Sequence, residues 1–204
     1  MKKQIIQLFH NMIDKDKRPG RYRVQKMARP EDPGITGGAE QSEDAVAGNV
    51  FDKTTDQKNF ERIVNEELHE EQETGCILIG DLDRFKDINE IYGRDTGDAV
   101  LRSTVNILNV YFKECVCIGR AGGDIFVLWI PGLSEEDTEY IRRQVGMVND
   151  RLLHPVKELP PVSVSVGVAF LKKGDDCRSL GKRASKMLYR VKESGRCGCE
   201  ISKV

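Results

Sequence analysis

The sequence predicts an α/β (α+β) sandwich whose central, mainly antiparallel sheet is flanked by helices. The first observation is that helical and strand-type apolar spacings alternate along the chain from about residue 50 onward. The second is a pair of apolar runs, residues 115–118 and 125–130, which are separated by a short turn with two adjacent glycines. Such a turn joins antiparallel strands, so the hairpin formed by these two runs is predicted to be antiparallel.

The spacing of apolar residues predicts each element in turn. Helices are expected over residues 57–72, 84–92, 96–113, 134–153 and 178–194. Strands are expected over residues 76–79, 115–118, 125–130, 162–170 and 199–202. Residues 162–166, Val-Ser-Val-Ser-Val, alternate as a half-buried strand does, and residues 134–137, Ser-Glu-Glu-Asp, resemble a capping box that opens a helix.

The first 49 residues differ from the rest of the chain. Residues 4–15 place apolar side chains at helical spacing, which predicts a short amphipathic helix. Residues 16–49 are rich in glycine, proline and charge and have little periodicity, which indicates a loosely ordered linker. We therefore expect two parts, residues 1–49 and a folded domain over residues 50–204.

Composition excludes several classes of function. The formal net charge is −1, so no bulk electrostatic attraction to nucleic acid is expected. No apolar run is long enough to span a bilayer, and the basic start is soon interrupted by acids, so a cytoplasmic protein is expected.

The cysteines and histidines do not form a metal-binding pattern. Six cysteines are present, but none form a C-x-x-C pair, and the three histidines are scattered singly. Cys115 and Cys117 are expected to share one face of a strand. Buried, reduced thiols are the interpretation that this pattern favours over a metal site.

Three carboxylates lie in two predicted turns, each of which directly follows a strand. Asp81 and Asp83 follow the first strand, and Asp83 is expected to cap the helix that comes next. Asp124 lies in the hairpin turn beside Gly122 and Gly123, whose small size permits turn geometry and close approach of an anion. Carboxylates from separate loops beside such a turn suit Mg²⁺ that is shared with the phosphates of a nucleotide.

Two cations at the end of the last helix fit the same hypothesis. Lys192 and Arg196 would form charge-assisted hydrogen bonds to those phosphates. The helix dipole explains basic residues at a helix C-terminus equally well, so both interpretations stay open at this point.

Four blocks of the sequence resemble the GGDEF domain of diguanylate cyclases. They are DLDRFKDINEIYGRDTGDAVL (81–101), RAGGDIF (120–126), VSVSVGVA (162–169) and ASKMLYRVKESGR (184–196). Their order and spacing fit over about residues 50–204. The resemblance implies a palm-like fold related to nucleotidyl cyclases and polymerases. It also implies condensation of two GTP molecules into cyclic di-GMP, with one GTP held by each half of a homodimer.

The resemblance assigns roles at the metal and at the turn. Asp81 corresponds to the metal-binding aspartate that follows the first strand, and Asp124 to the acidic third position of the signature, a metal-binding and catalytic position. Gly122 and Gly123 correspond to the turn glycines. Mg²⁺ bound together with GTP is the implied cofactor.

The resemblance also assigns the nucleotide contacts. Asn89 and Asp98 match the pair that reads the guanine edge; a carboxylate accepts from guanine N1–H and N2–H₂, and an amide serves its acceptor atoms. The phosphate side is assigned to four residues, Phe85, Lys86, Lys192 and Arg196.

One departure bears directly on the reaction. The fourth residue of the signature is glutamate in the family, and it is Ile125 here. Isoleucine neither ligates a metal nor accepts a proton, and loss of a general base typically lowers a rate by about 10²–10⁴. Two-metal chemistry also needs enough anionic ligands for both ions. The alternative role of Ile125 is to begin the second hairpin strand with its side chain packed against the sheet.

Further departures lie outside the signature. Arg94 replaces the usual histidine, Ser185 replaces the usual aspartate of the last helix, and residues 52–60, DKTTDQKNF, retain little of the turn that normally opens the domain. Residues 113–116, Lys-Glu-Cys-Val, replace the R-x-x-D motif of product inhibition, so cyclic di-GMP is not expected to bind there.

Three functional hypotheses remain. The first is a degenerate GGDEF domain that binds GTP and Mg²⁺ and regulates or binds a partner signalling protein or a second copy of itself. The second is an active diguanylate cyclase that tolerates Ile125. The third is a ligand-free interaction domain, for which the retained polar groups Asn89, Asp98, Lys192 and Arg196 would have no use.

Overall fold

The structure, a computed structural model, describes residues 54–69, 73–156 and 158–202. The predicted helix over residues 4–15, the linker over residues 16–49 and the domain boundary near Val50 lie outside the described residues. The family's opening turn, residues 52–60, is described from Thr54 onward.

The elements follow the predicted order. The helices are α2 (Gln57–His69), α3 (Phe85–Tyr92), α4 (Arg94–Tyr111), α5 (Thr138–Leu153) and α6 (Cys177–Glu193). The strands are β1 (Gly75–Leu82), β2 (Cys117–Gly122), β3 (Ile125–Pro131), β4 (Val164–Phe170) and β5 (Gly198–Ser202). The predicted capping box at Ser134 is confirmed, but it opens a short 3-10 helix, η2 (Glu135–Asp137), which leads into α5.

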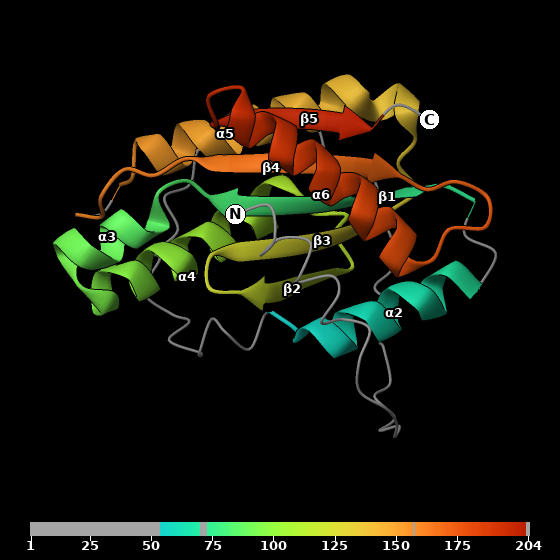
Figure 1. Ribbon diagram of the computed structural model, residues 1–204, viewed down its shortest axis with the longest axis horizontal. Helices are drawn as coiled ribbons and strands as arrows, with labels where there is room; N and C mark the ends of the chain where they lie inside the picture. Colours follow the sequence, from blue (N-terminus) through green and yellow to red (C-terminus); the bar gives the residue numbers. More distant parts are fainter. Residues whose placement is uncertain (1–53, 70–72, 157, 203–204) are drawn as a thin grey trace, which may run out of the picture.

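The strands form one five-stranded sheet in the order β2-β3-β1-β4-β5 (Figure 1). β1 lies at the centre and pairs antiparallel with both β3 and β4, and β2 and β3 form the predicted hairpin. Among the strand pairs of this sheet that the structure describes, β4–β5 alone is parallel. The predicted fold class, a mainly antiparallel sheet flanked by helices, is therefore confirmed.

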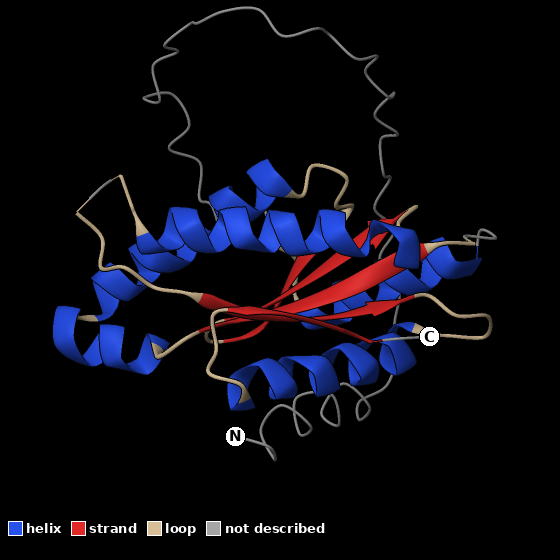
Figure 2. Ribbon diagram, turned by 90° about the horizontal axis from the view of Figure 1, so that it is seen from above, coloured by secondary structure: helices blue, strands red, loops and turns tan. Residues whose placement is uncertain are grey.

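The sheet lies between two helical layers (Figure 2). Side chains of α3, α4 and α5 pack on one face, around Leu78, Leu128 and Val166. Side chains of α2 and α6 pack on the other face, around Ile79 and Trp129. Strands β1 to β4 therefore present alternate residues to two different cores.

The prediction that the fourth strand is half-buried is wrong. Every residue of β4 is buried, because helices cover both of its faces. The valines face α4 and α5, and the small residues Ser165, Gly167 and Ala169 face α6. At Gly167 the helix comes so close that a Cβ atom would lie 2.1 Å from the Ala184 carbonyl oxygen and 2.2 Å from the Leu188 nitrogen.

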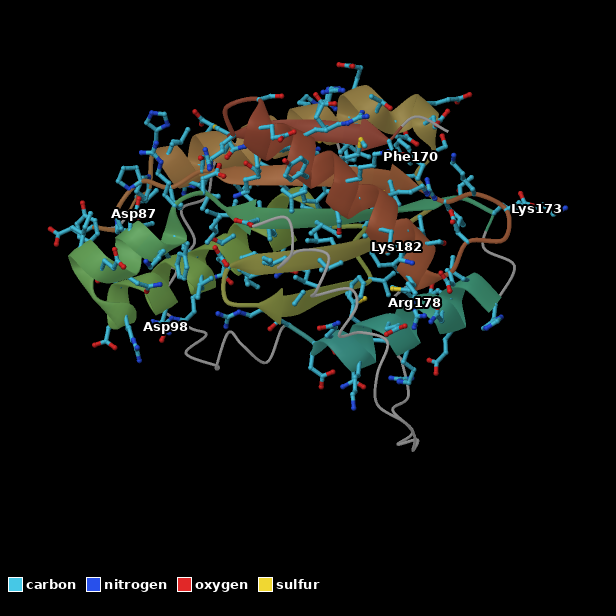
Figure 3. All side chains as sticks on the ribbon, viewed as in Figure 1. Asp87, Asp98, Phe170, Lys173, Arg178 and Lys182 are labelled. Atoms are coloured by element: carbon cyan, nitrogen blue, oxygen red, sulfur yellow. The ribbon has the colours of Figure 1, made fainter. Side chains whose placement is uncertain are left out.

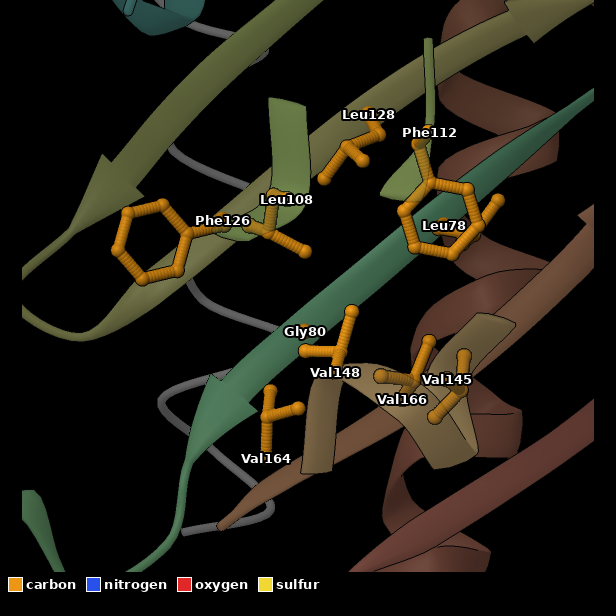
Figure 4. Close-up of a pocket in the computed structure, with 10 residues that line it drawn as sticks. All are labelled: Leu78, Gly80, Leu108, Phe112, Phe126, Leu128, Val145, Val148, Val164 and Val166. Carbon is orange, nitrogen blue, oxygen red and sulfur yellow. The ribbon is translucent and has the colours of Figure 1, made fainter. Parts of the chain in front are cut away.

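A small apolar cavity lies on the α4–α5 side of the sheet (Figure 4). Leu78 and Gly80 of β1, Leu108 of α4 and Val148 of α5 are among the residues that line it. All of its lining residues are apolar, so this cavity is part of the core and offers no polar group for a nucleotide.

The cysteine predictions hold only in part. The thiols in the described residues are free, but Cys197 is exposed, whereas the prediction was burial. Cys115 and Cys117 pack against opposite cores because β2 begins only at Cys117, so the expected shared face is wrong. None of the described helices has the length and apolar character needed to cross a membrane.

Candidate functional site

Asp81 lies near the end of β1 on the face covered by α6. It continues the row of Ile77 and Ile79, which face the α2–α6 core, and its register partners are Ile125 on β3 and Ser165 on β4. Lys192, in the last turn of α6, forms an ion pair with it at 2.6 Å between Nζ and Oδ1. The strand register and α6 therefore bring Asp81, Ile125 and Lys192 next to one another.

Lys192 bridges two carboxylates. Its Nζ atom also lies 2.8 Å from Oδ1 of Asp83, and the exposed fractions of the Lys192 and Asp83 side chains are 8% and 6%. Lysine and arginine at a helix end have a simple dipole explanation, but the side chain of Lys192 here turns toward the sheet. It is thus a component of the site and not a surface residue.

The prediction that Asp83 caps the next helix is wrong. The residue at the N-cap position of α3 is Arg84, which has a left-handed φ of 56° and makes no side-chain capping hydrogen bond. Asp83 instead accepts hydrogen bonds from Oγ of Ser163 at 2.7 Å and Oγ of Ser165 at 2.8 Å. Its backbone N–H donates to the Ser163 carbonyl, so the side chain points toward β4 and away from α3.

The hairpin turn brings Asp124 to the same place. Gly122 and Gly123 have positive φ values of 128° and 34°, a geometry that favours glycine. The Arg120 guanidinium donates to the Gly123 carbonyl, with Nη2 at 2.6 Å, and the Leu82 N–H donates to the Asp124 carbonyl at 3.2 Å. The turn is thereby attached to the end of β1.

The three carboxyl groups have different electrostatic environments. Burial raises the pKa of Asp81, with Lys192 opposing the shift and the charges of Asp124 and Asp83 adding to it. Burial also raises the pKa of Asp124. Burial acts in the same direction on Asp83, but hydrogen bonds from Lys192 and the two serines outweigh it, so the pKa of Asp83 is lowered.

Ile125 begins β3, as expected, and packs against the α2–α6 core. Because it is directly opposite Asp81 in an antiparallel pair, both side chains are on the same face, with Cβ atoms about 5 Å apart. Within the described residues, no group of three or more His, Cys, Asp or Glu side chains is arranged to hold a metal. The signature position that would add a carboxylate is the one that isoleucine occupies.

The two predicted guanine-reading residues come together at the α3–α4 junction. A Cβ atom on Gly97 would lie 2.0 Å from Oδ1 of Asn89, so the amide rests against the first turn of α4. Asp98, the next residue, is exposed. Figure 3 shows Asp98 at the α3–α4 end of the molecule, well away from Arg178 and Lys182 on α6.

The residues predicted to line the phosphate side differ in their exposure and in their partners. Phe85 is 8% exposed and its side chain belongs to the core, so only its backbone is free to face a phosphate. Lys86 is exposed and forms a surface ion pair with Glu90. Arg196 lies near Lys192, with its Nε atom 4.0 Å from Oδ1 of Asp83.

Sequence reasoning missed Ser163 and Ser165 as partners of Asp83. The signal was present in the alternation of serine and valine at the start of β4. Ser165 on the buried strand and the partly buried Ser163 just before it need hydrogen-bond partners, and Asp83 provides them. Arg120 was missed as well, and no pattern in the sequence indicates its bond to the turn.

Asp124→Asn is expected to raise the stability of the metal-free protein at neutral pH. The folded protein disfavours the ionised form of Asp124, whose pKa is raised by burial, and an amide removes that unfavourable charge. The gain should shrink as the pH falls through the raised folded-state pKa, and it should vanish below the ordinary value of 3.8. Chemical denaturation across this pH range measures it; a gain that persists at pH 3 would contradict the explanation.

The family follows from comparison with known proteins. The family model described as diguanylate cyclase, GGDEF domain, matches residues 49–197. The match covers most of the chain, and the chain therefore belongs to the GGDEF family. The matched domain is thus of a family related to cyclic di-GMP signalling.

Relatives with similar sequences are longer than this chain. An uncharacterized membrane protein of Staphylococcus saprophyticus is 36% identical over 147 residues, and one of Staphylococcus aureus is 32% identical over 146 residues. Each match covers 68% of this chain and 41% of the relative. The chain thus spans about two fifths of the length of the curated relatives that it matches.

Solved structures share the fold. The GGDEF domain of DgcB from Caulobacter crescentus, in complex with c-di-GMP, has a TM-score of 0.65 at 22% identity and covers 79% of this chain and 98% of its own. The active GGEEF domain of a Vibrio cholerae diguanylate cyclase has a TM-score of 0.65 at 24% identity, with coverages of 74% and 99%. SiaD from Pseudomonas aeruginosa, in complex with its activator SiaC, has a TM-score of 0.61 at 26% identity, with coverages of 73% and 59%.

Proposed function

We propose that this GGDEF domain binds GTP with one Mg²⁺ ion and acts as a regulatory or interaction module with weak or no cyclase activity. The observation that carries the proposal is the placement of Ile125 directly opposite Asp81, within a site whose other charged groups are in place. The polar groups support nucleotide binding, and the isoleucine argues against efficient condensation.

The residues present fit one divalent cation better than two. Burial raises the pKa of both Asp81 and Asp124, so a bound cation would relieve an unfavourable concentration of negative charge there. Mg²⁺ is commonly held by one or two carboxylates together with water and phosphate, and this is what Asp81 and Asp124 offer. When bound, the ion would neutralise phosphate charge; a second ion lacks the carboxylate that Ile125 does not supply.

Recognition of guanine is assigned to the α3–α4 junction. The amide of Asn89 rests against Gly97, and the exposed carboxylate of Asp98 follows directly. A carboxylate accepts hydrogen bonds from guanine N1–H and N2–H₂, whereas adenine offers no such pair of donors. Preference for GTP over ATP is therefore a specific consequence of the proposal.

GTP at millimolar concentration with Mg²⁺ is expected to raise the melting temperature, whereas ATP is not. A ligand at 100 times its dissociation constant stabilises a protein by about 2.7 kcal/mol, which corresponds to several degrees for a domain of this size. Differential scanning fluorimetry measures the shift. Asp98→Ala should abolish most of the GTP-dependent shift because it removes the acceptor for guanine N1–H and N2–H₂. Since Asp98 is exposed, its loss leaves the core unchanged.

Two results would contradict the proposal. Equal melting temperatures with and without GTP favour the ligand-free interaction domain. Rapid synthesis of cyclic di-GMP by the unmodified protein, lost in Asp124→Ala, favours the active cyclase.

The partner and the location are proposed on chemical grounds. In the family each GTP is held by one half of a homodimer, so a second copy of this domain or another GGDEF protein is the proposed partner. The pairing of SiaD with its activator SiaC offers a precedent for a different protein partner. The proposed location is the cytoplasm, where GTP is available.

A further inference from the structure

Asp83 accepts four hydrogen bonds, which is the full capacity of a carboxylate. Oδ1 accepts from Oγ of Ser165 and from Nζ of Lys192, both at 2.8 Å. Oδ2 accepts from Oγ of Ser163 at 2.7 Å and from the backbone N–H of Cys197 at 3.1 Å. A carboxylate has about four lone-pair sites, so no position is left on Asp83 for a metal or for a nucleotide.

The four donors come from three separate parts of the fold. Ser163 directly precedes β4 and Ser165 lies at its start, Lys192 is in the last turn of α6, and Cys197 is in the turn before β5. Asp83 therefore ties the end of β1 to the chain segments that carry Lys192 and Arg196, two of the predicted phosphate-binding cations. Its side chain is 6% exposed, so these charge-assisted bonds are shielded from water.

The turn after α6 needs such a bond. Arg196 and Cys197 have φ values of 72° and 51°, and the left-handed region is unfavourable for residues other than glycine. The Cys197 N–H bond to Asp83 helps to compensate for this backbone conformation, and the Arg196 N–H donates to the Val191 carbonyl. The direction of the Arg196 side chain therefore depends on a backbone that Asp83 stabilises.

The surroundings of Asp81 suit binding of a metal ion, whereas those of Asp83 suit holding Lys192. Asp81 shares Lys192 with Asp83 and lies beside the charge of Asp124, so a second cation would be favourable there. Asp83, by contrast, already accepts four hydrogen bonds, one of them from the Lys192 ammonium. If Asp81 turns to a metal, Lys192 still has Asp83 as its partner.

We propose that Asp83 is a positioning residue for phosphate recognition, which holds the Lys192 ammonium and the Arg196–Cys197 turn without itself touching nucleotide or metal. This inference rests on the proposed function because the phosphates are those of GTP. It goes further by assigning to Asp83 a role that neither the signature motif nor the metal site contains.

The test compares Asp83→Asn with the unmodified protein in two measurements. In the first, trace labelling with acetic anhydride and mass spectrometry report the reactivity of Lys192 relative to the exposed Lys86. The amide brings two donors toward groups that are themselves donors, so Lys192 labelling should rise by about threefold or more. In the second, calorimetry should show about tenfold weaker binding of GTP, while guanosine, which lacks phosphates, binds within about twofold of the parent.

Asn149→Ala is the matched control for a general loss of stability. Asn149 bonds both backbone groups of Val164 from α5, so its loss weakens the packing of α5 on β4 but removes none of the four donors to Asp83 and does not touch Lys192. It should lower the melting temperature without changing the Lys192 labelling ratio or the ratio of GTP to guanosine affinity. Ser163→Ala removes a single donor and should change both measurements in the direction of Asp83→Asn, by about two- to threefold.

Each outcome decides a separate point. Parent-like Lys192 labelling in folded Asp83→Asn would overturn the inference, as would equal losses of GTP and guanosine affinity. If Asp83→Asn does not fold, the Ser163→Ala result decides in the same way. Failure of the unmodified protein to bind GTP would contradict the proposed function, whereas the Lys192 labelling ratio still decides whether Asp83 positions that ammonium.

Discussion

Ile125→Glu is expected to raise cyclic di-GMP synthesis from little or none by about 10²-fold or more. The register places residue 125 directly opposite Asp81 and on the same face of the sheet. A glutamate at this position would bring a third carboxylate next to Asp81 and Asp124, where the burial of both already favours a cation. The measurement is product formation from GTP and Mg²⁺, followed by chromatography.

Ile125→Gln is the matched control because glutamine has the shape of glutamate without its charge. It should stay as inactive as the parent, and Ile125→Glu combined with Asp124→Ala should lose the gained activity. Because Ile125 also packs against the α2–α6 core, the stability of each variant is measured in parallel. An inactive but folded Ile125→Glu protein that binds GTP would contradict the view that this one side chain limits the reaction.

Gly167→Ala is expected to destabilise the domain by about 3 kcal/mol or more, which lowers the melting temperature by roughly 10 °C. The added methyl group would lie 2.1 Å from the Ala184 carbonyl oxygen and 2.2 Å from the Leu188 nitrogen. Both are backbone atoms of α6, so no side-chain rotation relieves the contact. The whole helix must move, and with it Lys192.

Gly146→Ala is the control for the same chemical change. Gly146 is an exposed position inside α5, and nothing lies within 4 Å of a Cβ atom there. Alanine should stabilise the helix by about 1 kcal/mol because glycine is a poor helix former. Chemical denaturation measures both variants; a loss of less than about 1 kcal/mol in Gly167→Ala would contradict the close packing of α6 on β4.

Most of the fold was predictable because it depends on local periodicity. The order of helices and strands, the antiparallel hairpin and the strand that begins at Ile125 all follow from apolar spacing and from the turn glycines. Asp81 and Asp124 were identified for the same reason, since each follows a clear strand or turn signal. Their electrostatic environment was not predictable, because burial depends on segments far away in the sequence.

The errors share a physical cause. Asp83 was expected to cap α3 because capping is the common local role of an aspartate before a helix. Its real partners lie 80 residues or more along the chain, at Ser163, Lys192 and Cys197. β4 was expected to be half-buried because alternation reports two different faces and does not reveal that α6 covers the second one.

By itself, the sequence determined the family and the missing carboxylate, because motifs of fixed spacing and the identity of Ile125 are local properties. Only the tertiary structure decided that Ile125 faces Asp81 and that Lys192 bridges Asp81 and Asp83. These contacts arise from strand register and from the packing of α6 against the small residues of β4. Both are long-range consequences of folding, so the charge distribution of the site exists only in the assembled domain.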